Sequence, residues 1–173
     1  RGGSVRRHGR LKSGEVIRSF PSYRHRPGHT AHPRTSPQGH SHGEPEPVSP
    51  ALTRDNWPHH EAWLFGVELF NGRYWWEAHE QWEAPWRVSD EELTRHLLQG
   101  LIQTAAALLK WDLGNERGRS GLWGRAEGHL ESVVSQQNPY LGLDVSSFIA
   151  QMQDLWQSRS AAVPPLQLTR PIS

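Results

Sequence analysis

The sequence predicts an all-α protein in which about five helices form a compact bundle around a buried central helix. From residue 51 onward, apolar residues recur at helical spacing, and no stretch shows the sustained alternation of a strand. Capping residues and Gly or Asn stops divide this part of the chain into helical lengths. All nine tryptophans of the 173-residue chain lie in it. We therefore expect one helical domain over residues 51–160.

The first predicted helix covers about residues 56–70. Asp55 is the expected cap, and Pro58 falls in the first turn, where a missing N–H is harmless. Asn71 and Gly72 should end this helix, because both residue types accept a positive φ.

The next two predicted helices are separated by a proline. The second covers about residues 73–84, and Pro85 should kink or end it, because proline lacks the N–H of the helical hydrogen bond. Ser89 and Glu92 form a Ser-x-x-Glu capping box that starts the third. That helix is apolar nearly all round between residues 97 and 109, which marks it as the most buried one.

Two further helices complete the expected bundle. The fourth covers about residues 119–136 and is weakened by three glycines. The fifth covers about residues 145–158, with Asp144 as its cap. Residues 161–173 are expected to form a flexible C-terminal tail.

The N-terminal segment has a different composition. Residues 1–50 hold nine Lys/Arg, three Asp/Glu and no tryptophan, a formal charge of +6, whereas the remainder carries −5. Such a segment buries too little apolar surface to offset its ordering entropy, so we predict a disordered basic tail. No rigid metal-ligand spacing organises its histidines His25, His29, His32, His40 and His42.

Composition also restricts the compartment and the partners. The chain lacks cysteine, which excludes disulfides and thiolate metal sites and fits a reducing, cytoplasmic compartment. No apolar run reaches the roughly 18 residues of a membrane span, and no secretory signal is recognisable. We expect the basic tail to hold nucleic acid only non-specifically. An Arg-rich, acid-poor tail also fits an organelle transit peptide, which is the alternative for localisation.

The residues most suited to catalysis or metal binding lie in the stretch FNGRYWWEAHEQWEAPWR at residues 70–87. It places Glu77, His79, Glu80 and Glu83 among four tryptophans. At roughly 100° per residue, His79 and Glu83 lie one helical turn apart and can reach a common point, with Glu80 beside them. Charged groups are seldom buried unless they are paired or bind a metal, so these should lie at the edge of an apolar surface.

The third predicted helix carries a matching polar stripe, Arg95, Gln99 and Gln103. A buried glutamine amide without partners costs about 1–3 kcal/mol per missing hydrogen bond. The carboxylates of the second helix are the obvious partners, and Arg95 can pair with one of them. We therefore predict that the second and third helices pack antiparallel, with their polar stripes face to face.

These residues allow two interpretations. In the first, His79 and Glu83 bind a divalent cation such as zinc, manganese, iron or magnesium, and Glu80 and Glu77 serve as acid–base groups. One helix supplies at most three ligands, so another histidine would have to complete the site: His59, His60, His129 or, best placed, His96. In the second, the same residues form a buried polar network that fixes the packing without catalysis.

The stretch at residues 70–87 and the segment LQGLIQTAAAL at residues 98–108, followed by Gly114 and Asn115, resemble the signatures of the DUF309 family. This family comprises small bacterial, archaeal and plastid-lineage proteins of unknown function. The resemblance covers roughly residues 60–135 and implies an all-helical fold with a central helix wrapped by others.

The resemblance also implies site residues. Members have been labelled predicted metal-dependent hydrolases on the strength of a His-Glu motif, and the corresponding motif residues here are Glu77, His79, Glu80, Glu83, Gln99 and Gln103. One departure is Lys110, where members often carry histidine. If that histidine is a ligand, its loss weakens a metal role, and the lysine could instead pair with Glu77 or Glu80.

Two functions from different classes follow. The first is hydrolysis of an unidentified small-molecule substrate by a metal-bound water. The second is a non-catalytic helical interaction module with a structural polar network, whose aromatic surface binds a protein partner or another copy of the chain as a homo-oligomer.

Overall fold

The computed structural model describes residues 18–158 and 162–171. These residues form a short 3-10 turn and five α-helices: η1 (Trp57–His59), α1 (Glu61–Asn71), α2 (Trp75–Val88), α3 (Glu92–Asp112), α4 (Glu116–Val134) and α5 (Val145–Ser158). The same ranges contain isolated β-bridges but no strand, so the predicted all-α class is confirmed. None of the helices described has the length and hydropathy that a bilayer crossing requires.

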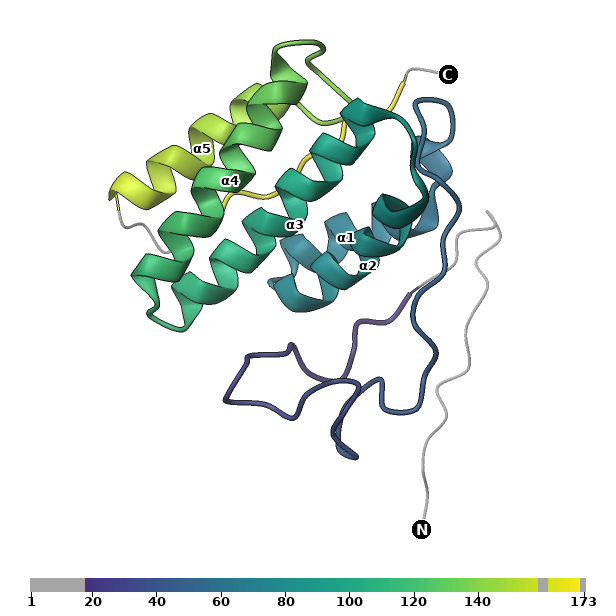
Figure 1. Cartoon of the computed structure of the whole chain (residues 1–173), viewed down its shortest axis with the longest axis vertical. Helices are drawn as coiled ribbons and strands as arrows, with labels where there is room; N and C mark the ends of the chain where they lie inside the picture. The colour runs from purple at the N-terminus through teal and green to yellow at the C-terminus, as the bar shows by residue number, and fades with distance from the viewer. Residues whose placement is uncertain (1–17, 159–161, 172–173) are drawn as a thin grey trace.

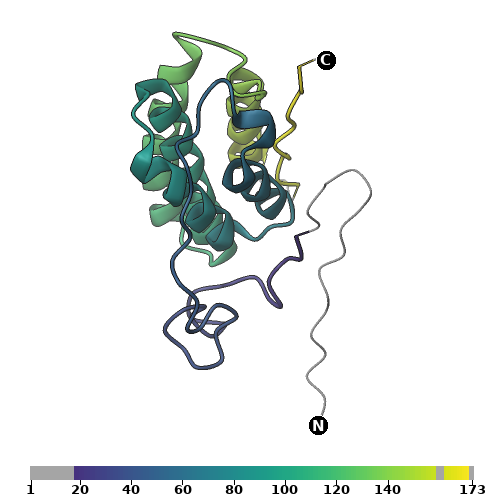
Figure 2. The same cartoon turned by 90° about the vertical axis from the view of Figure 1, so that its right-hand side faces the viewer.

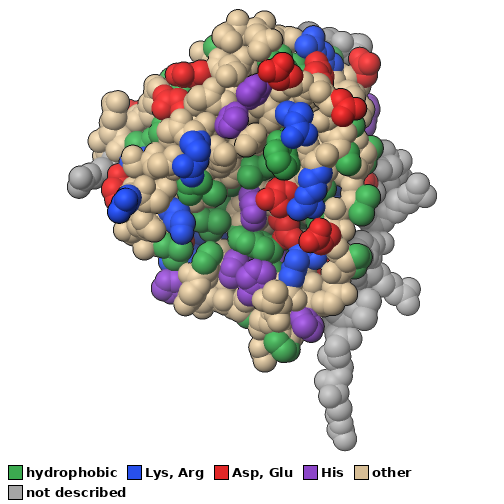
Figure 3. All heavy atoms as spheres, viewed as in Figure 1, with side chains coloured by type: hydrophobic (Ala, Val, Ile, Leu, Met, Phe, Trp, Pro, Cys, Tyr) green, Lys and Arg blue, Asp and Glu red, His purple; other side chains and the backbone are tan. Residues whose placement is uncertain are grey.

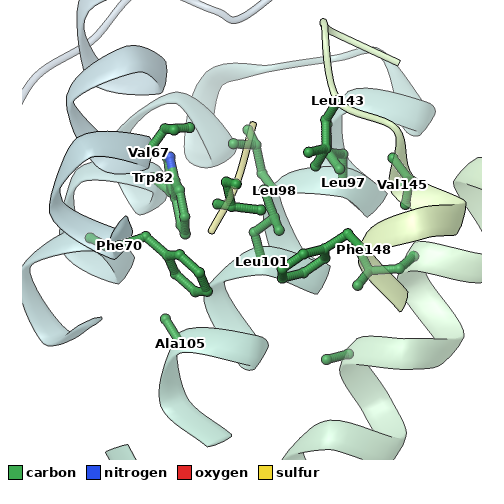
Figure 4. Packing of buried hydrophobic residues seen from close by; sticks show 14 of the residues in the cluster. Val67, Phe70, Trp82, Leu97, Leu98, Leu101, Ala105, Leu143, Val145 and Phe148 are labelled. Atoms are coloured by element: carbon green, nitrogen blue, oxygen red, sulfur yellow. The ribbon is translucent and has the colours of Figure 1, made fainter. Parts of the chain in front are cut away.

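The helices pack largely in chain order, and α3 lies between α2 and α4 (Figure 1). Its apolar residues are deeply buried, with Leu97, Leu98, Leu101 and Leu108 fully enclosed. This confirms the predicted central helix. Figure 4 shows how side chains of α1, α2 and α5 converge on this helix from different sides.

Trp82 of α2 packs directly against α1. Its indole lies against the rings of Trp63 and Phe70, and its Nε1 donates a hydrogen bond of 3.3 Å to the Trp63 carbonyl oxygen. Gly66 of α1 faces the same ring so closely that a Cβ there would come within 2.6 Å of Trp82 Cδ1. The absent side chain at position 66 therefore lets the two helices meet.

The first helix starts later than predicted. Residues 57–59 form the 3-10 turn η1, and α1 is capped by His60, whose Nδ1 accepts a hydrogen bond of 3.2 Å from the Trp63 N–H. The predicted cap at Asp55 is therefore wrong. As predicted, α1 ends at Asn71 and Gly72, although the positive φ that was expected of them lies at Arg73 instead. Asp144 caps α5 as predicted, by accepting from the Ser147 N–H at 3.1 Å.

The second helix continues through Pro85 to Val88, which corrects its predicted end. The Ser89 N–H and hydroxyl both donate to the Pro85 carbonyl oxygen, at 2.9 and 2.7 Å, and so close the last turn. Ser89 also accepts from the Leu52 N–H. Because Ser89 caps the end of α2 in this way, it does not form the predicted capping box, and α3 begins at Glu92 without it.

The predicted disordered tail extends too far, because residues 18–50, which we call the arm, pack against the bundle. The remainder of that prediction, residues 1–17, lies outside the described residues. The arm has no helix or strand, yet it lies across one end of the bundle and then runs along it to η1 (Figures 1 and 2). Polar contacts with acidic side chains, rather than apolar burial alone, hold it in place.

The C-terminal segment is also packed, contrary to the expectation of a flexible tail. Leu166 is buried, and the side chain of Asn71 both donates to its carbonyl oxygen at 2.9 Å and accepts from its N–H at 2.7 Å. This reciprocal pair ties residues 162–171 to the end of α1. Residues 161 and 172–173 lie outside the described ranges.

We expect Gly66→Ala to destabilise the fold by about 1–3 kcal/mol, because the new methyl group would overlap the enclosed Trp82 ring. Gly121→Ala is the matched control, since a Cβ at Gly121 of α4 meets open space. It should be neutral or stabilise by up to about 1 kcal/mol. Urea unfolding followed by circular dichroism measures both, and equal free energies of unfolding for the two variants would contradict the packing.

Candidate functional site

The most buried carboxylate of the α2 motif is held by the arm. Glu77 is 5% exposed. Its Oε1 accepts hydrogen bonds from the His25 backbone N–H at 2.7 Å and from His40 Nε2 at 2.9 Å. Within the described part of the chain no donor reaches its Oε2, which is also buried. Glu77 thus links two distant points of the arm to one position of α2.

Histidines of the arm gather around the neighbouring tryptophan. The rings of His25, His32 and His40 lie 5.2, 5.6 and 6.4 Å from Trp76, measured between ring centroids, with their planes steeply inclined to it. Figure 3 shows histidines clustered with apolar side chains on this face, beside acidic and basic groups. These histidines have no common spacing in the sequence, and their contact with α2 brings them to one place.

The environment of His25 favours its neutral form. Burial lowers the pKa of His25, and the neighbouring His32 and His40 lower it further, while a hydrogen bond involving the Ala31 backbone opposes them. With an ordinary imidazole pKa of 6.5 displaced downward, the ring is uncharged near neutral pH. The arm can therefore bury this residue without burying a charge.

Glu80 is engaged by a second basic residue of the arm. The Arg34 guanidinium forms an ion pair with Glu80 through its Nε, and it also donates to the carbonyl oxygens of Glu44 and Pro45 at 3.2 and 3.3 Å. Glu77 and Glu80 line one cavity of about 340 Å³ between the arm and α1–α2. A larger hollow of about 790 Å³ beside the start of α1 is lined by His59 and His60, two of the histidines considered as further ligands, but by none of the motif residues Glu77, His79, Glu80 and Glu83.

A third acidic residue that binds the arm, Asp112, lies at the end of α3. Asp112 accepts from Arg26 Nε at 2.6 Å, and Arg24 Nη1 lies 3.6 Å from the same carboxylate oxygen. Sequence reasoning missed this pair and the arm residues that bind Glu77 and Glu80. The excess of cations in the arm over the acidic helical part was the available signal, but it did not indicate which residues meet.

The structure separates His79 and Glu83 from the cavity that holds the other two motif carboxylates. The His79 Nδ1–H donates to the Trp76 carbonyl oxygen, which turns Nε2 toward Glu83 Oε1 at 3.6 Å. Glu83 also lies 3.4 Å from Arg87. Both partners of the His79–Glu83 pair are partly exposed, at 23% and 32% of their side chains.

The polar stripe of α3 does not meet the carboxylates of α2 as predicted. Arg95 donates to the carbonyl oxygens of Trp86 and Ser89, at 2.7 and 3.2 Å, because the last turn of a helix leaves its carbonyls free. Its guanidinium also lies over the Trp86 ring. Among the described residues, Gln99 and Gln103 make no hydrogen bond to those carboxylates, and Gln103 Oε1 is buried without a partner.

Three of the four other histidines considered as ligands are engaged elsewhere. His96 of α3 lies 2.9 Å from His129 of α4, measured between their Nδ1 atoms, and His60 bonds the Pro50 carbonyl oxygen. In the described ranges no three histidine, aspartate or glutamate side chains converge as metal ligands. Neither Glu77 nor Glu80 forms an ion pair with Lys110 there, since both are occupied by the arm.

Comparison with known proteins supports the resemblance. The family described as a domain of unknown function (DUF309) matches residues 63–122, which include all of α2 and α3 but not the arm. No curated protein and no solved structure matches the chain. The two motifs that suggested the family fall within the matched segment, so this chain is similar to the DUF309 family over residues 63–122.

Proposed function

We propose that the helical domain is a docking module whose acidic α2 face binds an extended segment rich in histidine and arginine, here the arm of the same chain. The observation that carries this proposal is the bonding of Glu77, a buried carboxylate, by a backbone N–H and an imidazole of a segment without regular structure. This arrangement is a form of the interaction module that the sequence suggested as the alternative to an enzyme.

The charges of the two surfaces support docking. Four arginines of the arm contact acidic side chains of the helical part, and opposite charges on two surfaces fix register and partner choice more than raw affinity. The buried contacts contribute most to the free energy of docking, because each hydrogen bond to a charged group is worth about 1.5–3 kcal/mol. The Arg18–Glu61 pair, with Glu61 74% exposed, adds little.

Metal-dependent hydrolysis is the second candidate. It is favoured by His79, because a histidine that donates one ring N–H to a carbonyl and turns the other nitrogen outward resembles a metal ligand. The fit is incomplete, however, since His79 and Glu83 provide two ligands and a catalytic zinc site uses three. The expected general base, Glu80, is already paired with Arg34. The described residues therefore fit docking better.

We expect Glu77→Ala to release the arm, because the variant removes the acceptor of both hydrogen bonds. Trypsin cleavage after Arg24 and Arg34 should accelerate at least about tenfold, the factor that corresponds to 1.4 kcal/mol. Cleavage is followed by mass spectrometry, and circular dichroism confirms that the helices persist. Glu131→Ala, at an exposed position of α4, is the matched control and should behave like the wild type. Unchanged cleavage in Glu77→Ala would refute docking through this carboxylate.

Metal analysis distinguishes the two candidates. If the module only docks the arm, the metal content of purified protein should be the same in wild type and in His79→Ala, because His79 and Glu83 alone hold a cation weakly. Inductively coupled plasma mass spectrometry measures this, with His42→Ala as the control for loss of an exposed histidine. A stoichiometric metal lost in His79→Ala but kept in His42→Ala would favour the hydrolase instead.

A further inference from the structure

Three side chains connect the arm and α2 in a hydrogen-bonded line. Ser41 Oγ lies 2.8 Å from His40 Nδ1, and His40 Nε2 lies 2.9 Å from Glu77 Oε1. The side chains of His40 and Glu77 are only 5% and 4% exposed, whereas Ser41 is half-buried. A hydroxyl, an imidazole and a carboxylate thus follow one another from the surface inward.

The buried carboxylate determines the roles of the two ring nitrogens. Glu77 Oε1 accepts from His40, so Nε2 carries the ring proton and Nδ1 presents its lone pair to the Ser41 hydroxyl. The same carboxylate oxygen accepts from the His25 N–H, which holds it in position. A nucleophile in contact with a base that a third group orients is the arrangement of an activated serine.

A cavity adjoins this line. Its volume is about 340 Å³, and Ser41, His40 and Glu77 are all part of its lining. Phe65, Leu69 and Trp76 provide apolar walls, and Arg34, ion-paired with Glu80 of the same lining, places a guanidinium there. Apolar walls suit a small acyl group, and a cation stabilises the negative charge that develops on a carbonyl oxygen during acyl transfer.

We propose that the docked arm forms a serine esterase site for esters with small apolar acyl groups. Ser41 Oγ bonds to the acyl carbon while its proton passes to His40 Nδ1, and the alcohol leaves with that proton. Water then attacks the acyl-serine, gives a proton to His40, and the carboxylic acid leaves as Ser41 recovers its proton. Glu77 is a positioning residue that orients the ring and stabilises the imidazolium. The proposal rests on the docking of the arm proposed above.

A fluorophosphonate probe on the full chain tests this site, because it labels activated serines covalently. Peptide mapping by mass spectrometry should find the label on Ser41. Ser41→Ala should lose it, and His40→Gln should slow labelling at least about 100-fold, the lower range for loss of a general base. Ser36→Ala, in the same arm but bonded to Gln38, is the matched control and should label like the wild type. Labelling is preferred to ester turnover, because free imidazoles also cleave activated esters.

The positioning role of Glu77 has its own measurement. Glu77→Gln keeps an acceptor oxygen but removes the charge that favours the imidazolium, so the midpoint of the labelling rate against pH should move to lower pH. A variant that only loosened the structure would lower the rate without moving the midpoint, which would contradict this role.

Trypsin protection of the arm, measured on the same samples, separates the two proposals. Ser41→Ala should keep the arm as protected as in the wild type, since Ser41 bonds His40 of the arm and it is His40 that bonds Glu77 of α2. A protected arm without label on Ser41 would overturn the esterase site and leave docking intact. An unprotected arm in the wild type would overturn both.

Discussion

A carboxylate removed from water must find donors nearby, and at Glu77 the arm provides them. The His25 backbone N–H and the His40 imidazole converge on one oxygen of this side chain, although the arm and α2 are separated by the whole of α1 in the sequence. These two hydrogen bonds join the arm to α2 beside the cavity between arm and helices, at the position where His40 also contacts Ser41. The ion pair at Glu80 and the contacts at Asp112 extend the same attachment to either side.

The helical bundle gives that carboxylate a fixed place. Trp82 closes α2 against α1 where Gly66 leaves room for its ring, and the buried leucines of α3 pack on the other side. Because α2 is held by both neighbours, Glu77 is presented at the surface of a rigid core rather than on a loop. The arm has few apolar side chains, so its polar contacts add to the ring contacts at Trp76, Phe65 and Tyr74 in offsetting the entropy of ordering.

The sequence was sufficient for the features that depend on local patterns. Helical spacing, the stop at Asn71 and the apolar run of α3 predicted the bundle and its central helix. The motif of α2 did not indicate that its side chains divide into two groups, with Glu77 and Glu80 in the cavity under the arm and the His79–Glu83 pair outside it. The sequence was insufficient where contacts between residues far apart in the chain determine the local structure. Ser89 looks like a helix start but closes the end of α2, and composition alone predicted disorder for an arm that contacts Glu77 and Asp112. No periodicity reports such long-range polar contacts.

Hydrogen exchange at the His25 amide tests this account most directly. That N–H lies in a segment without helix or strand and bonds only Glu77 Oε1 in the described structure, so its exchange rate reports this single contact. In the full-length chain we expect exchange at least about tenfold slower than in an unstructured peptide of the same sequence, because opening must break a charge-assisted hydrogen bond. Exchange at the rate of the unstructured peptide would mean that the arm is not seated on α2.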